Sequence, residues 1–216
     1  MIEVRRDAER YRGGDPGAGI DSRHAFSFGA HYDPTNLRFG LLLACNEERL
    51  APGAGFAEHP HRDTEIVTWV VEGELTHHDS AGHSAVVRPG QAQLLSAGAG
   101  VRHTERNEGT GPLTFVQMWL HPAAFGTPPR YAVRTAADLA PLGQPGAELL
   151  VLRSAAPLPA APFLYVHCVR GRLRLAGHTL GPGDAARITA EAGLHAEPDG
   201  EAEYLALAMD GEPSYG

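Results

Sequence analysis

The sequence predicts a mainly β protein built from two similar β-rich units of unequal size. Short runs of β-forming residues, such as Ile66–Val71 and Thr114–Leu120, are bounded by glycine and proline. The apolar spacing of an amphipathic helix is nearly absent. Strand signals that recur about every 8–12 residues are typical of a sandwich or a barrel. One order of strands and turns also occurs twice along the chain.

The first half of the chain holds the clearest strand and turn signals. A short predicted strand covers Ala85–Val87, between the two longer runs. Turn residues separate the strands at Glu72–Glu74, Asp79–Gly82 and Arg88–Gly90. Glycine, aspartate and proline supply the backbone angles of tight turns, so these segments predict hairpins.

Composition changes after the first half. Between His121 and Glu148 the chain becomes rich in alanine, proline and glycine, after which a β pattern resumes. Such a shift is typical of a connection between domains. We therefore predict an N-terminal domain over residues 1–125, a connection over residues 126–147 and a smaller C-terminal domain over residues 148–216.

The second unit repeats the first in shorter form. Val70–Leu75 is echoed by Cys168–Leu173, and Val87–Ala92 by Leu180–Ala185. The two glycines of these segments are 17 positions apart in the first copy and 12 in the second, so the second hairpin is shorter. The pattern predicts duplication of one β unit.

Composition excludes several classes of partner and compartment. The formal net charge is −8 and the arginines are not clustered, which argues against a nucleic acid or an anionic membrane as the main partner. Cys45 and Cys168 lie too far apart in sequence for a disulfide framework or a thiolate metal site. The charged N-terminus lacks the apolar segment of a signal peptide. We expect a cytoplasmic protein.

Four polar residues stand out among a total of twelve histidines and many acids. His59 and His61 are two residues apart, as are His103 and Glu105, so each pair points to one face of an extended strand. Three nitrogens and one oxygen suit Fe(II), Mn(II), Ni(II), Cu(II) or Zn(II). Glu65 also lies an even number of positions from His59 and His61, so on one extended strand it would share their face. Spacing therefore leaves open which glutamate is the fourth ligand. His77, His78 and His83 flank a turn, where we expect polar hairpin residues.

The second unit lacks part of this pattern. His195 and Glu197 follow its turn where His103 and Glu105 follow the first. The positions that match the other two histidines are Pro157 and Pro159, which cannot bind a metal. We predict a second unit without metal.

These motifs resemble those of a known family. The spacings around His59, His61 and Glu65, and around His103 and Asn107, resemble the two motifs of the cupin barrel. The chain further resembles the pirin family, especially short bacterial pirin-like quercetinases, in several segments that recur in order: His59–Glu65, Glu72–Gly73, His78–Gly82, Ser96–Glu105, Ser22–Gly29, Tyr32–Pro34 and Gln117–Trp119.

The resemblance implies a fold and a metal site. The fold is a bicupin, in which an N-terminal double-stranded β-helix binds metal and a smaller C-terminal cupin is degenerate. The implied ligands are His59, His61, His103 and Glu105. The metal is one divalent transition ion, with Fe(II) favoured over Mn, Ni, Cu, Co and Zn. Glu65 then orients an imidazole or takes a substrate proton, as Glu105 also can.

The resemblance also implies a function. It predicts a metal-dependent dioxygenase that opens flavonols such as quercetin with O2 and releases carbon monoxide, so the partners are a small aromatic substrate and O2. One alternative is a non-catalytic, iron-binding redox sensor that modulates a regulatory protein partner. Another is a cupin isomerase or epimerase, which needs no redox metal.

Overall fold

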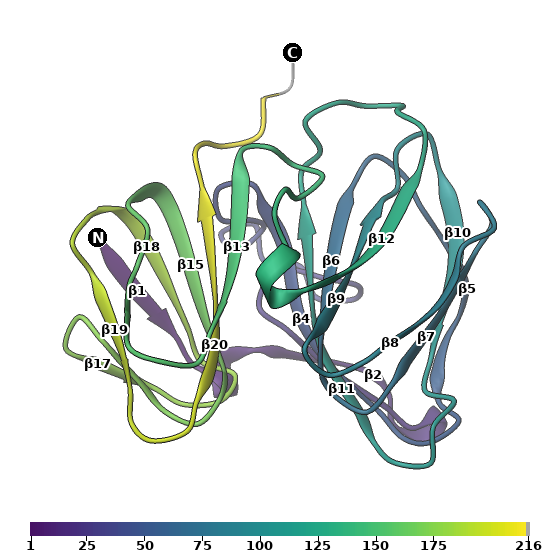
Figure 1. The fold of residues 1–216 in the computed structure, drawn as a ribbon, viewed down its shortest axis with the longest axis horizontal. Helices are drawn as coiled ribbons and strands as arrows, with labels where there is room; N and C mark the ends of the chain where they lie inside the picture. The colour runs from purple at the N-terminus through teal and green to yellow at the C-terminus, as the bar shows by residue number, and fades with distance from the viewer. Residues whose placement is uncertain (215–216) are drawn as a thin grey trace. The chain divides into compact units, whose positions relative to one another are not determined.

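The protein consists of antiparallel strands and short 3-10 helices, which confirms the mainly β fold class (Figure 1). The computed structural model describes residues 1–214. Two compact units share the chain: Tyr11–Leu37 and Leu42–Gln144 form the larger, whereas Met1–Arg10, Arg38–Leu41 and the part after Pro145 form the smaller. Within the described residues, no helix has both the length and the apolar character needed to cross a membrane.

The larger unit contains two sheets. One has seven strands in the order β12-β9-β6-β11-β4-β3-β2, and the other has four in the order β5-β10-β7-β8. The seven are β2 (Tyr11–Asp15), β3 (Ile20–His24), β4 (Leu42–Leu50), β6 (Glu65–Glu72), β9 (Gln91–Ser96), β11 (Leu113–Leu120) and β12 (Arg130–Thr135). The four are β5 (Gly55–His61), β7 (Leu75–Asp79), β8 (Ser84–Val87) and β10 (Val101–Arg106). Its 3-10 helices are η2 (Pro16–Ala18) and η3 (Ala136–Asp138).

The smaller unit also contains two sheets. Their orders are β1-β18-β15-β20-β13 and β14-β19-β16-β17. The first sheet comprises β1 (Ile2–Arg5), β13 (Ala147–Leu152), β15 (Ala161–Arg170), β18 (Ala185–Glu191) and β20 (Glu203–Met209). The second comprises β14 (Ala156–Pro157), β16 (Leu173–Leu175), β17 (His178–Leu180) and β19 (His195–Pro198). The 3-10 helix η1 (Asp7–Glu9) follows β1.

The two units share one topology, as the sequence repeat predicts. The order β9-β6-β11-β4 corresponds to β18-β15-β20-β13, and β5-β10-β7-β8 corresponds to β14-β19-β16-β17. Gly73 and Gly171 have the same φ of 78°, a left-handed conformation that favours glycine. The Gly90 N–H donates to the Val70 carbonyl, and the Gly183 N–H donates to that of Cys168. Matching turns and strand order support a duplicated β unit.

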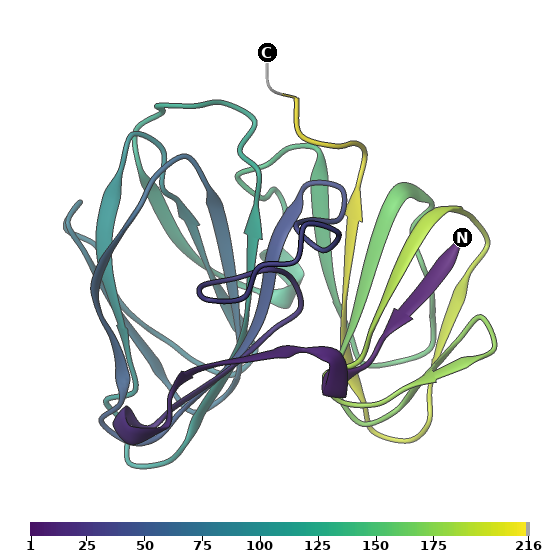
Figure 2. The same ribbon diagram turned by 180° about the vertical axis from the view of Figure 1, so that it is seen from behind.

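The N-terminal strand belongs to the smaller unit. β1 pairs with β18 in the register Ile2↔Ile188 and Val4↔Ala186 (Figure 2). It occupies the edge position that β12 occupies on β9 in the larger unit. The boundaries predicted from the sequence therefore differ from the units in three places, one of which is Arg38–Leu41, a segment of the smaller unit within the predicted N-terminal domain. Residues 1–10, predicted in the N-terminal domain, belong to the smaller unit. Residues 126–144, predicted as a connection, supply β12 to the larger unit.

The interior of the larger unit changes from apolar to polar along its strands. Val70 and Phe115 belong to a buried apolar cluster. Two residues along the same strands, Thr68 and Gln117 are polar yet buried, and the Gln117 amide donates to the Thr68 hydroxyl at 3.1 Å. A buried polar group is costly without a partner. The polar layer therefore marks the place in the barrel where a site is built.

The pairing of β1 predicts a stability effect from one face of that strand. Val4 is partly buried against the core of the smaller unit, whereas Glu3 is exposed. We expect Val4→Asp to destabilise the fold by about 1–3 kcal/mol, because it removes apolar contact and places a charge against the core. Urea unfolding followed by circular dichroism measures the change. Glu3→Gln is the matched control; equal midpoints for the two variants would show that β1 does not stabilise the unit.

Candidate metal centre

Three histidines converge where β5 and β10 pair. The antiparallel register sets His59 opposite His103 and His61 opposite Val101. The side chains of His59, His61 and His103 each offer a ring nitrogen, and these nitrogens lie within 4.8 Å of one another. The ring centroids of His59 and His103 are 4.4 Å apart. The structure thus brings together the three histidines that strand alternation predicted.

The proton of His59 is held away from its neighbours. Its Nδ1 lies 2.8 Å from the Ala57 carbonyl oxygen, which can only accept, so Nδ1 carries the proton. Nε2 is then the ring nitrogen that is left to bind a metal. This Nε2 is 2.9 Å from Nε2 of His103.

A chain of hydrogen bonds assigns the protons of His103 in the same way. Burial opposes ionisation of Asp79, but hydrogen bonds from the His83 backbone and from His77 lower its pKa below the ordinary value. The ionised carboxylate accepts from His77 Nε2 at 3.2 Å. His77 Nδ1 is then an acceptor, and it lies 3.4 Å from His103 Nδ1. The His103 proton accordingly sits on Nδ1, which leaves Nε2 unprotonated.

The buried rings stay neutral at neutral pH. Burial, reinforced by the neighbouring His59, lowers the pKa of His61 to about 4. Burial and the other histidines lower the pKa of His103 further. With the protons assigned to Nδ1, the two Nε2 atoms, 2.9 Å apart, are the nitrogens that a bound cation would share. The donor set therefore fits a divalent transition metal.

Glu105 lies beside this group in a fixed position. Its carboxylate is buried and accepts from the side-chain amides of Gln93 and Gln117. Burial raises its pKa to about 7, although both amide contacts oppose the shift. A carboxylate oxygen lies within 4.8 Å of ring nitrogens of His77 and His103. Among the described residues Glu105 is thus grouped with His103 and His77, and not with all three predicted histidine ligands.

His77 contacts His103, although the sequence predicts only a polar hairpin residue at this position. Its side chain is fully buried, and its ring stacks on Tyr131 at a centroid distance of 4.3 Å. The signal in the sequence is its two-residue spacing from Asp79, which puts an imidazole and a carboxylate on one face of β7.

Glu65 does not reach the metal centre. Its buried carboxylate accepts from the Ser96 hydroxyl on β9, and Glu65 does not line the cavity beside the histidines. Asp63, with φ of 48°, interrupts the extended backbone between β5 and β6. The alternation of strand faces that begins at His61 therefore does not continue across Asp63 to Glu65. Thr68, three residues further along, faces the polar interior, so Glu65 faces the opposite side of the sheet.

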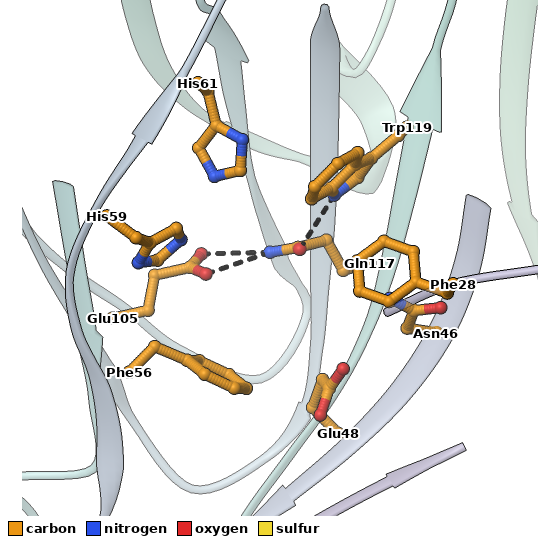
Figure 3. Close-up of a pocket in the computed structure, with 9 residues that line it drawn as sticks. All are labelled: Phe28, Asn46, Glu48, Phe56, His59, His61, Glu105, Gln117 and Trp119. Atoms are coloured by element: carbon orange, nitrogen blue, oxygen red, sulfur yellow. Dashed lines mark hydrogen bonds between the residues drawn. The ribbon is translucent and has the colours of Figure 1, made fainter. Parts of the chain in front are cut away.

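A cavity of about 160 Å³ opens beside the histidines (Figure 3). Aromatic rings form its walls. The Trp119 indole N–H donates to the Gln117 amide oxygen at 2.9 Å, and its ring meets His61 edge-on at 4.9 Å. This volume exceeds the ~30 Å³ of one water molecule several times and admits a small ligand. The lining residues are Phe28, Asn46, Glu48, Phe56, His59, His61, Glu105, Gln117 and Trp119.

Glu48 lies at the end of the cavity away from His61 (Figure 3). It is 4% exposed, and the Ser22 hydroxyl donates to its carboxyl group. Burial raises the pKa of Glu48 to about 8; the Ser22 contact opposes this shift, and the charges of Glu105 and Asp21 add to it. The folded protein therefore holds Glu48 largely protonated at neutral pH.

Comparisons with known proteins cover both units. A family model described as Pirin matches residues 4–120, and one described as Quercetinase C-terminal cupin domain matches residues 154–209. A Mycobacterium tuberculosis protein provisionally named quercetin 2,3-dioxygenase is 43% identical over an alignment of 213 positions, which covers 87% of this chain and 86% of its own. Quercetin 2,3-dioxygenase of Escherichia coli is 42% identical over 136 residues, 62% of this chain and 58% of its own.

The solved structures agree with the sequence comparisons. The crystal structure of the bacterial pirin YhhW from Escherichia coli in complex with nickel(II) matches with a TM-score of 0.88 and 30% identity. The match covers 99% of this chain and 100% of that chain. The similarity therefore extends over both β units.

Glu48 gives a prediction for stability against pH. Between its ordinary pKa of 4.5 and the folded value of about 8, the folded state binds a proton that the unfolded chain releases. Stability therefore falls as the pH rises through this range. We expect Glu48→Gln, which keeps the shape and the Ser22 contact, to reduce that fall in metal-free protein. Urea midpoints from pH 5 to about 9 measure it; an unchanged slope would mean that Glu48 is not buried as described.

His77 gives a prediction for metal affinity. His77→Phe keeps a ring against Tyr131 but removes the acceptor for His103 Nδ1. Loss of a partner that orients a metal-binding histidine typically weakens affinity about 10- to 100-fold, which we expect here for Ni(II) or Zn(II). Competition with a chromophoric chelator measures the dissociation constant. His78→Phe makes the same change at the exposed neighbouring position. Equal metal affinities in the two variants would show that His77 does not orient His103 for metal binding.

Proposed function

The chain belongs to the pirin family, and from that premise we propose that it is a metal-dependent dioxygenase that opens flavonols such as quercetin with O2. Its two β units are the N-terminal and C-terminal cupins of that family. Names of relatives place quercetin 2,3-dioxygenases in the family. One observation carries the proposal: the ring nitrogens of three histidines converge beside an aromatic-walled cavity.

The proposed metal ligands are His59, His61, His103 and Glu105. The three histidines supply the converging nitrogens, and Glu105 supplies the adjacent buried carboxylate. Binding of nickel(II) by the related YhhW supports a divalent ion in this family. The resemblance favours Fe(II), and the same nitrogen and oxygen donors also accept Mn, Co, Ni, Cu or Zn.

The cavity residues bind and orient the substrate in this proposal. When bound, the metal supplies Lewis acidity, which polarises the 3-hydroxyl and 4-carbonyl of a flavonol and favours loss of the hydroxyl proton. Phe28, Phe56 and Trp119 offer apolar faces to flat rings and exclude water. Glu105, held by two glutamine amides, accepts the hydroxyl proton on a carboxylate oxygen. Glu65 has no role here, because Ser96 binds it outside the cavity.

The overall reaction balances without another reductant. Both atoms of O2 enter the ring-opened ester product, and the carbon that carried the 3-hydroxyl leaves as carbon monoxide. The substrate supplies all the electrons, so neither a flavin nor a nicotinamide is required.

The smaller unit has no part in the proposed chemistry. Pro157 lies opposite His195 on the paired strands β14 and β19, as His59 lies opposite His103 on β5 and β10. Proline offers no donor atom for a metal. Within the described residues, the groups able to hold a metal all lie in the larger unit. We therefore propose one metal ion per chain.

Paired substitutions test the proposed function. We expect His103→Ala to abolish stoichiometric metal binding and to lower flavonol oxidation about 100-fold or more, because it removes a ligand. His195→Ala, at the corresponding position of the smaller unit, should change neither. Oxygen uptake, loss of flavonol absorbance and carbon monoxide release measure the reaction, and elemental analysis measures the metal.

The wild-type protein decides between the proposal and its alternatives. Absence of oxygen uptake with quercetin after loading with Fe(II), Mn(II), Co(II), Ni(II) or Cu(II) would refute the dioxygenase. Substrate turnover that persists without oxygen would instead indicate an isomerase or epimerase. Binding of a regulatory protein that follows the oxidation state of bound iron, without oxygenase activity, would indicate a redox sensor.

A further inference from the structure

Two polar residues of β4 lie at the end of the cavity away from His61, where neither metal binding nor proton transfer uses them. Asn46 and Glu48 are two residues apart, so both point to the interior face of the strand. Both line the cavity, and Figure 3 shows them across it from His59 and Glu105. Their place in the cavity suggests a role in recognising the substrate.

Asn46 has a hydrogen-bonding capacity that the described residues leave unused. The side chain is 2% exposed, and its Oδ1 is buried without a hydrogen-bond partner. A buried carbonyl oxygen without a donor is unfavourable and is rare in folded proteins. Asn46 lines the cavity, so its side-chain amide belongs to the wall that a bound ligand contacts.

Glu48 adds a second hydrogen-bonding group beside Asn46. Among the described residues, the Ser22 hydroxyl donates a hydrogen bond to Oε2 of its carboxyl group. Burial keeps this carboxyl largely protonated at neutral pH, so it can donate as well as accept. A phenolic hydroxyl has the matching capacity, since it donates one hydrogen bond and accepts others.

The space between the two polar ends is aromatic. Trp119 meets Phe28 edge-on at 5.1 Å and His61 at 4.9 Å. Phe56 lies on the same side of the cavity as His59 (Figure 3). The cavity thus matches a flat aromatic molecule that carries oxygen atoms at both ends.

We infer that Asn46 and Glu48 bind a hydroxyl group on a ring of the substrate remote from its metal-binding oxygens, and that this contact selects polyhydroxylated flavonols over 3-hydroxyflavone. The inference rests on the proposed function for the position of the metal-binding end. A site that buries polar groups discriminates strongly against an analogue that leaves them unpaired. Binding at this end acts before the chemical step and therefore governs KM.

Turnover of two flavonols by matched variants tests the inference. Metal-loaded wild-type protein should prefer quercetin to 3-hydroxyflavone by about 100-fold or more in kcat/KM. Asn46→Leu combined with Glu48→Leu replaces both polar groups with branched apolar side chains, and should reduce that preference at least about 10-fold through a higher KM for quercetin. Glu48→Gln should retain most of the preference. Comparing ratios between proteins cancels the different intrinsic reactivities of the two flavonols.

Controls separate this inference from folding and from the proposed function. Asp21→Asn removes an acid near Glu48 that does not line the cavity, and should leave the preference unchanged. Quenching of tryptophan fluorescence measures binding of each flavonol to metal-loaded protein. If no flavonol is turned over, the proposed function fails, and the binding preference still tests the inference. An equal quercetin preference in wild type and the double leucine variant, in both turnover and binding, would overturn it.

Discussion

Two imidazole nitrogens that face each other without a proton between them constrain the whole site. His59 and His103 are 2.9 Å apart at Nε2, and their other hydrogen-bond partners assign each proton to Nδ1. The Ala57 carbonyl and His77 fix those protons, and the pairing of β5 with β10 fixes the distance. With that assignment, a bound cation would stabilise the close approach of the two nitrogens. Strand pairing and hydrogen bonding therefore both prepare the proposed metal site.

The duplicated fold holds this contact in its larger unit, so the barrel topology does not by itself create it. Both units have the same strand order and matching turn glycines, yet Pro157 stands opposite His195 where His59 stands opposite His103. The smaller unit keeps a continuous apolar core around Val166 and Tyr204. One copy of the topology thus holds the proposed metal centre, while the other holds a continuous apolar core.

The sequence predicted most of the fold and the three histidines, because alternation along a strand is a local property. It could not assign His77, whose contact with His103 depends on the lateral pairing of β7 with β10. It also could not place Glu65, since the left-handed Asp63 breaks the parity that the count assumed. The edge position of β1 depends on a partner strand more than 180 residues away, which no local pattern specifies.

The positions of the protons on the histidine rings test the proposed metal centre most directly. Two-bond ¹H–¹⁵N correlation spectra of metal-free protein, assigned by single histidine substitutions, report which ring nitrogen is protonated. We expect the proton on Nδ1 in His59 and His103 and on Nε2 in His77. A proton on Nε2 of either His59 or His103 would turn their close approach into an ordinary hydrogen bond and contradict the proposed metal centre.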